Sequence, residues 1–568
     1  MAVILGGCQS PNSALDSPAG RYLAIARERI EHKDVAEADA ALKRAEEIDP
    51  NLAGRGNLLR KDIAAGYLER GTTRMEEDDP AGAIADLSRA LELQPDLGAA
   101  FQNRGLLRIK NGDAAKGLAD LDQAVRLLPE DASCFFLRAQ AKADLGDANG
   151  AIADLDRSIS LDPKNALSRD LRGNLRMARK DFAGAIEDFD EAIASDPTGS
   201  WAYNNRGCAK KETGDFLGSI ADFTQALMRK EDPGTYVNRG DAFIRAGQFE
   251  QASADLSKAL ALKPNLAEVH RSLAYLSAKK GNLPSAIASY GRYLEKNPND
   301  ARALFDRGTL RACTGDLAGG LADISRAIEI MPDFMEAYVH RGNIRADQGD
   351  RPAAIADYTR AIELRPTATA YSNRANQFAQ LGNMDAAATN CDKALSLDPG
   401  YLLANWTRGN VRFVKGNFEG AIVDFDAAIQ LGTPNSERLR FSRILALRLL
   451  RRDDGSIELS RVAAKWPDEW MKTIAHFLLG ELGEPEFLKA ASAGSAMNVE
   501  AQKRGAFYYA GMMRLIRGDN DGARVLLERA KAASLSIPME LALANAALQM
   551  LGPAHSTIPP PTADTVEQ

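Results

Sequence analysis

The sequence predicts an all-α fold, an α-solenoid of consecutive helical hairpins, on three observations. Aromatic residues make up 6% and charged residues 26% of a composition rich in helix-forming alanine. A set of marker residues recurs at steps of 33 or 34 along most of the chain. As compact globules the 568 residues would need several domains, whereas a repeat array escapes that limit because each unit contacts only its neighbours.

The repeat is marked by an arginine and a proline, with small residues between them. Pro129 follows Arg104 by 25 residues, Gly112 follows it by eight, and most other units keep these spacings. In one unit Leu273 replaces the arginine. The arginines are Arg70, Arg104, Arg138, Arg172, Arg206, Arg239, Arg307, Arg341, Arg374 and Arg408.

These markers predict a hairpin of two helices, A and B. A glycine such as Gly146 ends helix A at a turn. Helix B then carries an apolar stripe at helical spacing, as at Ile152 and Leu155. The proline stops helix B because it has no backbone N–H to donate. The thirteenth residue after the arginine is always small, as Ala151 is, since a larger side chain would hold helices A and B apart.

An aspartate stands sixteen residues after the arginine, on helix B. Arg104 and Asp120 illustrate this spacing, and the unit with Leu273 has Ser289 at the matching position. We therefore expect a ladder of Arg–Asp ion pairs that ties helix A to helix B. The alternative is that the arginines bind a ligand.

The pattern resembles the tetratricopeptide repeat family, including its Asn-Arg-Gly version at Asn103-Arg104-Gly105. The resemblance covers residues 19–435 as about twelve repeats, with an insertion near residues 53–63. It implies a right-handed superhelix of helical hairpins in which helix A lines the concave face. It also implies that the chain binds other proteins or extended peptides.

Asparagines on the predicted helices A are the candidate partner-binding residues. Their amides both donate and accept hydrogen bonds, which suits the backbone of an extended peptide. The alternative is that they satisfy neighbouring helices or face water. The lysine and asparagine clamp of family members that bind chaperone tails is not matched. One set, Asn103, Asn205, Asn238 and Asn373, precedes the arginine, and the other, Asn174, Asn343, Asn376 and Asn410, follows it by two residues.

Residues 436–551 keep helical character but lose the strict pattern, which predicts a degenerate helical cap. Gly511 and Leu527 preserve the spacing of one further unit. Trp466-Pro467 and Phe507-Tyr508-Tyr509 resemble the C-terminal part of NlpI-type bacterial lipoproteins, which implies an adaptor role. The arginine-rich stretch at 438–452 is either the solvated face of a solenoid helix or a surface for membranes or partners.

The two ends differ from the array. Residues 1–18 include Leu5-Gly6-Gly7-Cys8, which resembles the lipobox of bacterial lipoprotein precursors and implies a lipid on Cys8, followed by a tether. A positive leader is absent here, so we expect the true start upstream; the alternative is a frayed terminus. Residues 552–568 are polar and proline-rich, and we expect a disordered tail.

Known catalytic signatures are missing from the sequence. It has no phosphate-binding loop, no HExxH motif and no paired CxxC among its five cysteines, and Cys391 falls at a core position. We therefore expect no enzyme activity, cofactor or metal. The net charge of −7 argues against nucleic acid, and no 18-residue apolar run could span a membrane.

The predicted function is a scaffold or adaptor for protein–protein interaction, placed as a periplasm-facing lipoprotein of a bacterial cell envelope. It would recruit partner enzymes or secretion components through its concave face. A cytoplasmic assembly scaffold and a scaffold of polysaccharide export are the alternatives. The oligomeric state and the identity of the partners remain open.

Overall fold

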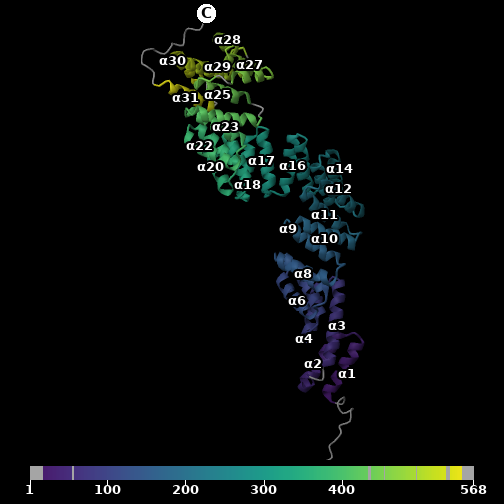
Figure 1. Cartoon of the computed structure of the whole chain (residues 1–568). Coiled ribbons are helices and arrows are strands. Elements are labelled where there is room, and N and C mark those ends of the chain that lie inside the picture. Colours follow the sequence, from purple (N-terminus) through teal and green to yellow (C-terminus); the bar gives the residue numbers. More distant parts are fainter. Residues whose placement is uncertain are drawn as a thin grey trace, which may run out of the picture. The chain divides into compact units, whose positions relative to one another are not determined.

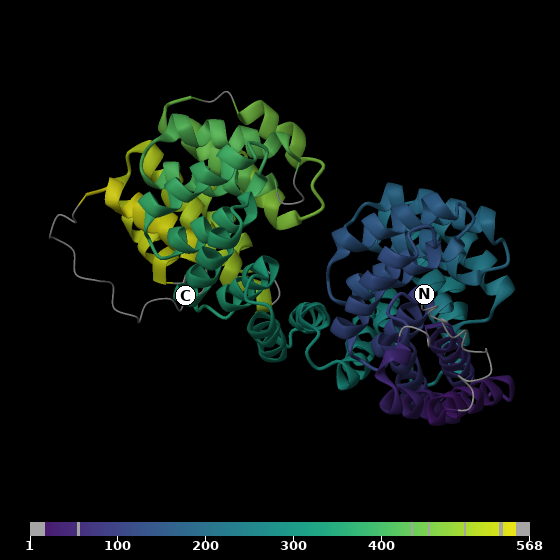
Figure 2. The same ribbon diagram turned by 90° about the horizontal axis from the view of Figure 1, so that it is seen from below.

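The computed structural model describes residues 17–53, 57–432, 436–452, 455–493, 496–532 and 538–552. All regular secondary structure in these ranges is helical, as predicted. The chain divides into two compact units between Lys279 and Lys280 (Figures 1 and 2), and each is described by itself. The predicted lipidation residue Cys8 and the tail beyond Gly552 lie outside the described residues.

The first unit is a succession of helical hairpins, each an A helix packed on a B helix. Neighbouring hairpins stack in chain order. Its helices are α1 (Pro18–Glu31), α2 (Val35–Ile48), α3 (Asn57–Glu76), α4 (Pro80–Leu93), α5 (Gly98–Lys110), α6 (Ala114–Leu127), α7 (Ala132–Asp144), α8 (Ala148–Leu161), α9 (Ala166–Ala178), α10 (Phe182–Ser195), α11 (Ser200–Thr213), α12 (Phe216–Arg229), α13 (Pro233–Arg245), α14 (Phe249–Leu262) and α15 (Ala267–Lys279), with a 3-10 turn at Pro50–Ala53.

The second unit continues the hairpins and ends in the cap. The boundary between the units falls within the repeat at 267–300, between the two helices of the unit that lacks the Arg–Asp pair. Its helices are α16 (Leu283–Lys296), α17 (Ala301–Cys313), α18 (Leu317–Ile330), α19 (Met335–Asp347), α20 (Arg351–Leu364), α21 (Ala368–Gln380), α22 (Met384–Leu397), α23 (Leu402–Val414), α24 (Phe418–Gln430), α25 (Ser436–Leu449), α26 (Ser456–Ala463), α27 (Glu469–Leu479), α28 (Glu484–Ala490), α29 (Ala496–Arg517), α30 (Asn520–Ala532) and α31 (Pro538–Met550).

The α5–α6 hairpin shows why the repeat sequence folds this way. Helix α5 ends before Gly112, whose φ of +84° suits glycine, and Asp113 then caps α6 by accepting the backbone N–H of Lys116 at 3.3 Å. A Cβ on Gly105 would lie 2.9 Å from Leu121 Cγ. The small residue therefore lets helix A approach helix B closely.

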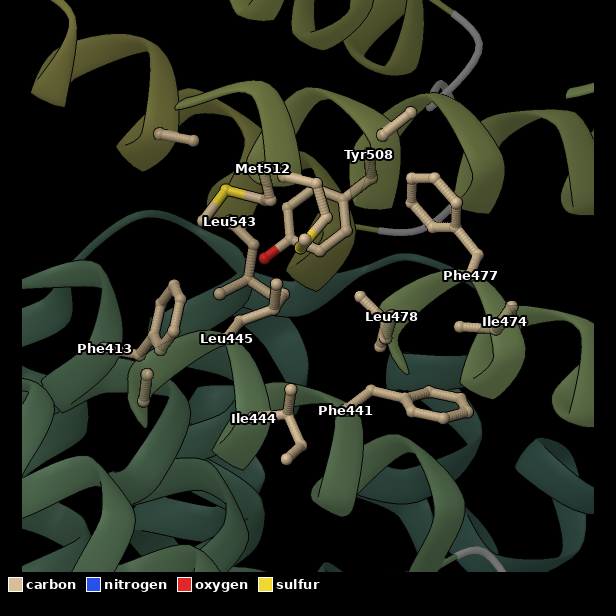
Figure 3. Packing of buried hydrophobic residues seen from close by; sticks show 14 of the residues in the cluster. Phe413, Phe441, Ile444, Leu445, Ile474, Phe477, Leu478, Tyr508, Met512 and Leu543 are labelled. Atoms are coloured by element: carbon tan, nitrogen blue, oxygen red, sulfur yellow. The ribbon is translucent and has the colours of Figure 1, made fainter. Parts of the chain in front are cut away.

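Helix α25 lies at the centre of the cap core. Its Phe441, Ile444 and Leu445 are buried against α27, α29 and α31 (Figure 3). Arg440 and Arg443 pair with Glu458 at the edge of this core. The apolar face of the arginine-rich stretch is thus buried inside the protein and is not available as a membrane-binding face. Arg440 and Arg443 are themselves largely buried in ion pairs, so this part of the stretch is not the solvated face either.

Helices α29 and α30 form the degenerate hairpin predicted in the cap. A Cβ on Gly511 would lie 2.8 Å from Leu527 Cγ, as in the hairpins of the array. Gly518 has a φ of +84° at the turn, and Asp519 accepts the backbone N–H of Gly522 at 2.9 Å. The last repeat pattern therefore still specifies the hairpin, although much of the cap sequence differs.

Successive helices A contact each other within each unit. Among the described residues, α9 contacts α11 and α11 contacts α13 in the first unit, and α21 contacts α23 in the second. Successive helices B make no contact of that extent in the described ranges. The A helices therefore line the inner side of the curve, which we call the inner face.

Candidate functional site

The Arg–Asp ladder exists as predicted in nine repeats. In each, Nε and Nη2 of the arginine donate to the carboxylate sixteen residues later, at 2.5 to 3.2 Å. All nine carboxylates are buried. Such two-point pairs join helix A to helix B, so these arginines are structural. The aspartates are Asp86, Asp120, Asp154, Asp188, Asp222, Asp255, Asp323, Asp357 and Asp424.

Each rung holds more than the two predicted residues. In eight of the nine rungs a second Arg or Lys, four residues after the first, contacts the same aspartate at 2.7 to 3.0 Å. Several ladder arginines also reach the preceding helix B, as Arg206 reaches Asp190 at 2.5 Å. The hydrogen bond to Asp222 is the main cause that raises the pKa of Arg206. The ladder therefore ties consecutive hairpins together as well as the helices of one hairpin.

One rung departs from the expectation that every arginine has its aspartate. Position 390 is Asn390, whose Oδ1 accepts from Arg374 Nε at 2.9 Å. Thr359 accepts from Nη1 of the same guanidinium at 2.9 Å. Without a carboxylate at this position, burial lowers the pKa of Arg374. The ladder is thus interrupted by a neutral rung here, in addition to the pair lost at Leu273 and Ser289.

The asparagines that precede the arginine link successive A helices. Asn103 donates to Thr72 at 3.3 Å, and Asn373 donates to Asn343 at 3.0 Å. Asn238 donates to Asn204 at 3.2 Å. In each case the acceptor lies on the preceding helix A. Their amides therefore hold neighbouring repeats together, and their role in partner binding stays a prediction.

The asparagines two residues after the arginine differ among themselves. Asn343 accepts the hydroxyl of Tyr358 at 2.8 Å, and Asn376 accepts from Gln380 at 3.3 Å. Asn174 is exposed and donates to Asp170 at 3.0 Å. Asn410 is 6% exposed, and its amide has no hydrogen-bond partner among the described residues. The second set thus leaves one buried amide available to a ligand.

Asn410 belongs to a cavity on the inner face of the second unit. The cavity has a volume of about 200 Å³ and lies between α21 and α23. Thr407, 8% exposed, also lines it and has no hydrogen-bond partner among the described residues. The lining contains no charged residue; it consists of Ser372, Asn373, Asn376, Leu403, Trp406, Thr407 and Asn410.

The walls of this cavity combine apolar surface with unsatisfied polar groups. Leu403 is 46% exposed beside Trp406, and together they offer an apolar wall. The Thr407 hydroxyl and the Asn410 amide lie on the same face of α23 as that wall and supply both donors and acceptors beside it. A site of this kind fits an uncharged group that buries an apolar part and hydrogen-bonds at one end.

The inner face ends at helix α31. This helix contacts α21 and α23, and its Asn545 and Gln549 face the end of α21 across a second cavity of about 340 Å³. Leu543 and Ala547 on its other side are buried in the cap core. The contact of the final helix with the A helices was not predicted from the sequence.

The first unit carries a different group on its inner face. Asp170 of α9 accepts from Asn205 of α11 at 2.7 Å as well as from Asn174. Asp170 occupies the position two residues before the ladder arginine, where the chaperone-tail clamp is unmatched. This carboxylate was not among the candidate binding residues that the sequence indicated.

Metal-ligating side chains and buried cysteines are the remaining candidates for a chemical role within the described ranges. No group of three or more His, Cys, Asp or Glu side chains in these ranges could hold a metal ion. Cys391 is fully buried as predicted, and burial raises its pKa to about 12, which makes it a poor nucleophile. Over the same ranges, no helix is both long and apolar enough to cross a membrane.

Comparison with known proteins confirms the tetratricopeptide repeats. Residues 136–200, 273–333 and 340–401 match a model described as tetratricopeptide repeat, and residues 240–281 match a model described as TPR repeat. Proteins with these repeats generally act as scaffolds for protein interaction. The described chain is an α-solenoid of such hairpins with a degenerate helical cap.

Several solved structures match parts of this chain at low sequence identity. A tetratricopeptide repeat protein from Parabacteroides merdae is 18% identical over 41% of this chain and 92% of its own, with a TM-score of 0.35. The Cut9–Hcn1 hetero-tetramer of APC/C is 15% identical over 77% and 98%, with a TM-score of 0.38. Yeast Tom70 is 17% identical over 68% and 95%, with a TM-score of 0.34. With TM-scores this low, these similarities imply nothing about partners.

Proposed function

We propose that this protein is a non-enzymatic scaffold that binds extended segments of partner proteins on its inner face. The cavity at Thr407 and Asn410 is the observation that supports it. The Thr407 hydroxyl and the Asn410 amide line this cavity and have no hydrogen-bond partner among the described residues, so a peptide that enters it can bond to them beside the exposed, apolar Leu403.

A display library of random dodecapeptides, selected on the full-length protein, tests this proposal. We expect a family of peptides whose binding is weakened at least tenfold by Thr407→Val or Asn410→Leu. Because neither side chain has a hydrogen-bond partner among the described residues, both variants should melt at or above the temperature of the unchanged protein. Loss of affinity without loss of stability separates a binding role from a structural one.

A matched control is Asn149→Ala. Asn149 lies on helix B α8, away from the inner face, and accepts a hydrogen bond from Arg179. This variant should leave peptide affinity unchanged. The proposal is overturned if no peptide is enriched, or if the enriched peptides bind the Thr407 and Asn410 variants as tightly as the unchanged protein.

We further propose that the scaffold works as a lipoprotein facing the periplasm of a bacterial envelope, where it collects envelope enzymes or secretion components. Two features of the sequence support this: the Leu5-Gly6-Gly7-Cys8 motif and the similarity of the cap sequence to NlpI-type lipoproteins. A cytoplasmic scaffold without lipid, or one for polysaccharide export, is the alternative.

Lipidation is tested by labelling cells with a radioactive fatty acid while they express the gene with its upstream reading frame. We expect label in the unchanged protein and none after Cys8→Ala. An unlabelled protein, or a Cys8→Ala variant that still carries label, would contradict the lipoprotein assignment and leave the scaffold proposal intact.

A further inference from the structure

Asp170 is held in a fixed orientation on the inner face of the first unit. Asn205 Nδ2 donates to one of its carboxylate oxygens at 2.7 Å, and Asn174 Nδ2 donates to the other at 3.0 Å. Asn205 is itself positioned by Asn204, which donates to its Oδ1 at 3.3 Å. Asn204 in turn accepts from Asn238 of α13. A chain of amides across α9, α11 and α13 therefore fixes this one carboxylate.

No cation accompanies Asp170 among the described residues. Its hydrogen-bond partners are both neutral amides, and no nearby charge contributes to its pKa, which burial raises. The ladder aspartates contrast with it, because each of the nine has at least one guanidinium and eight have a second cation. Asp170 is thus a partly buried acid whose counter-ion is missing from this part of the protein.

The remaining capacity of the carboxylate points to what it would bind. A carboxylate accepts about four hydrogen bonds, and Asp170 uses two. A cation there would make charge-assisted hydrogen bonds in a partly desolvated site, where they are stronger than in water. The cation would also neutralise the charge of Asp170, as the arginines and lysines of the ladder neutralise the ladder aspartates.

We propose that Asp170, oriented by Asn174 and Asn205, is the recognition site for one basic side chain, lysine or arginine, of an extended partner segment. The inference deepens the proposed function and rests on it, since it assigns a charge preference to the peptide bound on the inner face. The uncharged cavity at Asn410 and the acidic site at Asp170 lie in different units and are tested separately.

The experiment uses the random dodecapeptides selected on the full-length protein. Some of the peptides should share a lysine or arginine at one fixed position. Replacing that residue by norleucine, which keeps the aliphatic chain and removes the charge, should weaken binding about tenfold to a hundredfold. On the Asp170→Asn variant the same replacement should leave peptide affinity unchanged, because the carboxylate that binds the basic side chain is absent.

Asp241→Asn is the matched control. Asp241 lies on α13 at the position that Asn174 occupies on α9, so the variant removes the same charge from the same face. The norleucine effect should persist in this variant. Loss of the effect in both variants would show a general attraction to negative charge and would overturn the assignment to Asp170.

The other outcomes are equally decisive. Selection of no peptide at all would refute the proposed function itself. Peptides that bind without any conserved basic residue, or whose basic residue matters as much on Asp170→Asn as on the unchanged protein, would refute this inference alone. Should the variant unfold, the pKa of Asp170 measured by NMR decides the matter in the unchanged protein, because the lysine peptide should lower it and the norleucine peptide should not.

Discussion

Removal of Arg239 should destabilise its hairpin far more than removal of Arg104 destabilises its own. Asp255 is 7% exposed and receives both of its hydrogen bonds from Arg239, at 2.7 and 2.8 Å. Four residues after Arg239 stands Phe243, where eight other rungs have a second cation. Asp120, 4% exposed, is bound by Arg104 and also by Arg108 at 2.7 Å. The two rungs therefore differ in how many cations remain after one arginine is lost.

The magnitudes follow from what each variant leaves behind. Arg239→Met preserves the aliphatic stem but leaves a buried carboxylate with no cation, which destabilises by about 3–5 kcal/mol. Arg104→Met leaves Asp120 paired with Arg108, so only the charged hydrogen bonds of one arginine are lost, about 1.5–3 kcal/mol. The double variant Arg239→Met with Asp255→Leu should recover most of the loss, because an apolar pair replaces a buried ion pair at little cost.

Hydrogen exchange is the suitable measurement, because it reports the stability of a single hairpin, whereas a melting curve reports the array as a whole. The free energy of opening is measured for amides of α13 and α14 in the Arg239 variants, and of α5 and α6 in the Arg104 variant. Equal losses in the two single variants would refute the role assigned to the second cation. A double variant less stable than Arg239→Met would show that the loss in the single variant does not come from leaving the buried Asp255 carboxylate without a cation.

Three further perturbations test other parts of the packing. Asn390→Asp should stabilise the protein by about 1–2 kcal/mol, since it gives Arg374 a charged instead of a neutral acceptor; chemical denaturation with no gain would contradict this. Gly207→Ala should destabilise by about 1–3 kcal/mol, because the new Cβ would lie 2.8 Å from Phe223 Cε1; an unchanged melting temperature would show that the ring gives way freely. Burial lowers the pKa of His340 below 6.5, so the unfolded chain binds the proton better and stability falls as the pH drops below 6.5; His340→Leu should flatten that part of the pH dependence of the melting temperature.

The fold was predictable because its signals act locally and repeat. Each feature of the hairpin is specified by a single residue. These residues are a glycine with positive φ at the turn, a small residue where the helices cross and a proline after helix B, and they recur in most repeats. The Arg–Asp pairs were predictable for the same reason, since their separation is constant. The second cation, at Arg108 in its own rung, follows an equally constant spacing of four and could have been found in the same way.

Other features needed the three-dimensional structure. That Asn103 and Asn373 donate to the preceding helix A depends on contacts between repeats, which a spacing within one repeat does not reveal. That Asp170 has two amides and no cation as its hydrogen-bond partners among the described residues depends on how α9 packs against α11. The two compact units meet between α15 and α16, in the repeat with Leu273. In the sequence this repeat differs only by the missing Arg–Asp pair, which does not reveal a boundary.

The ladder and the candidate binding groups divide the polar residues of the array into two kinds. Ladder aspartates such as Asp120 are buried, and cations of the protein itself already balance their charge, so we call them saturated. Asp170, Thr407 and Asn410 are also largely buried, yet each retains hydrogen-bonding capacity that no described residue fills. Removing a saturated group should reduce stability and leave affinity unchanged in hairpins distant from the ligand, whereas removing an unfilled one should reduce affinity and leave stability unchanged or raised. The sign of the stability change therefore separates scaffold from site, residue by residue, before any natural partner is known.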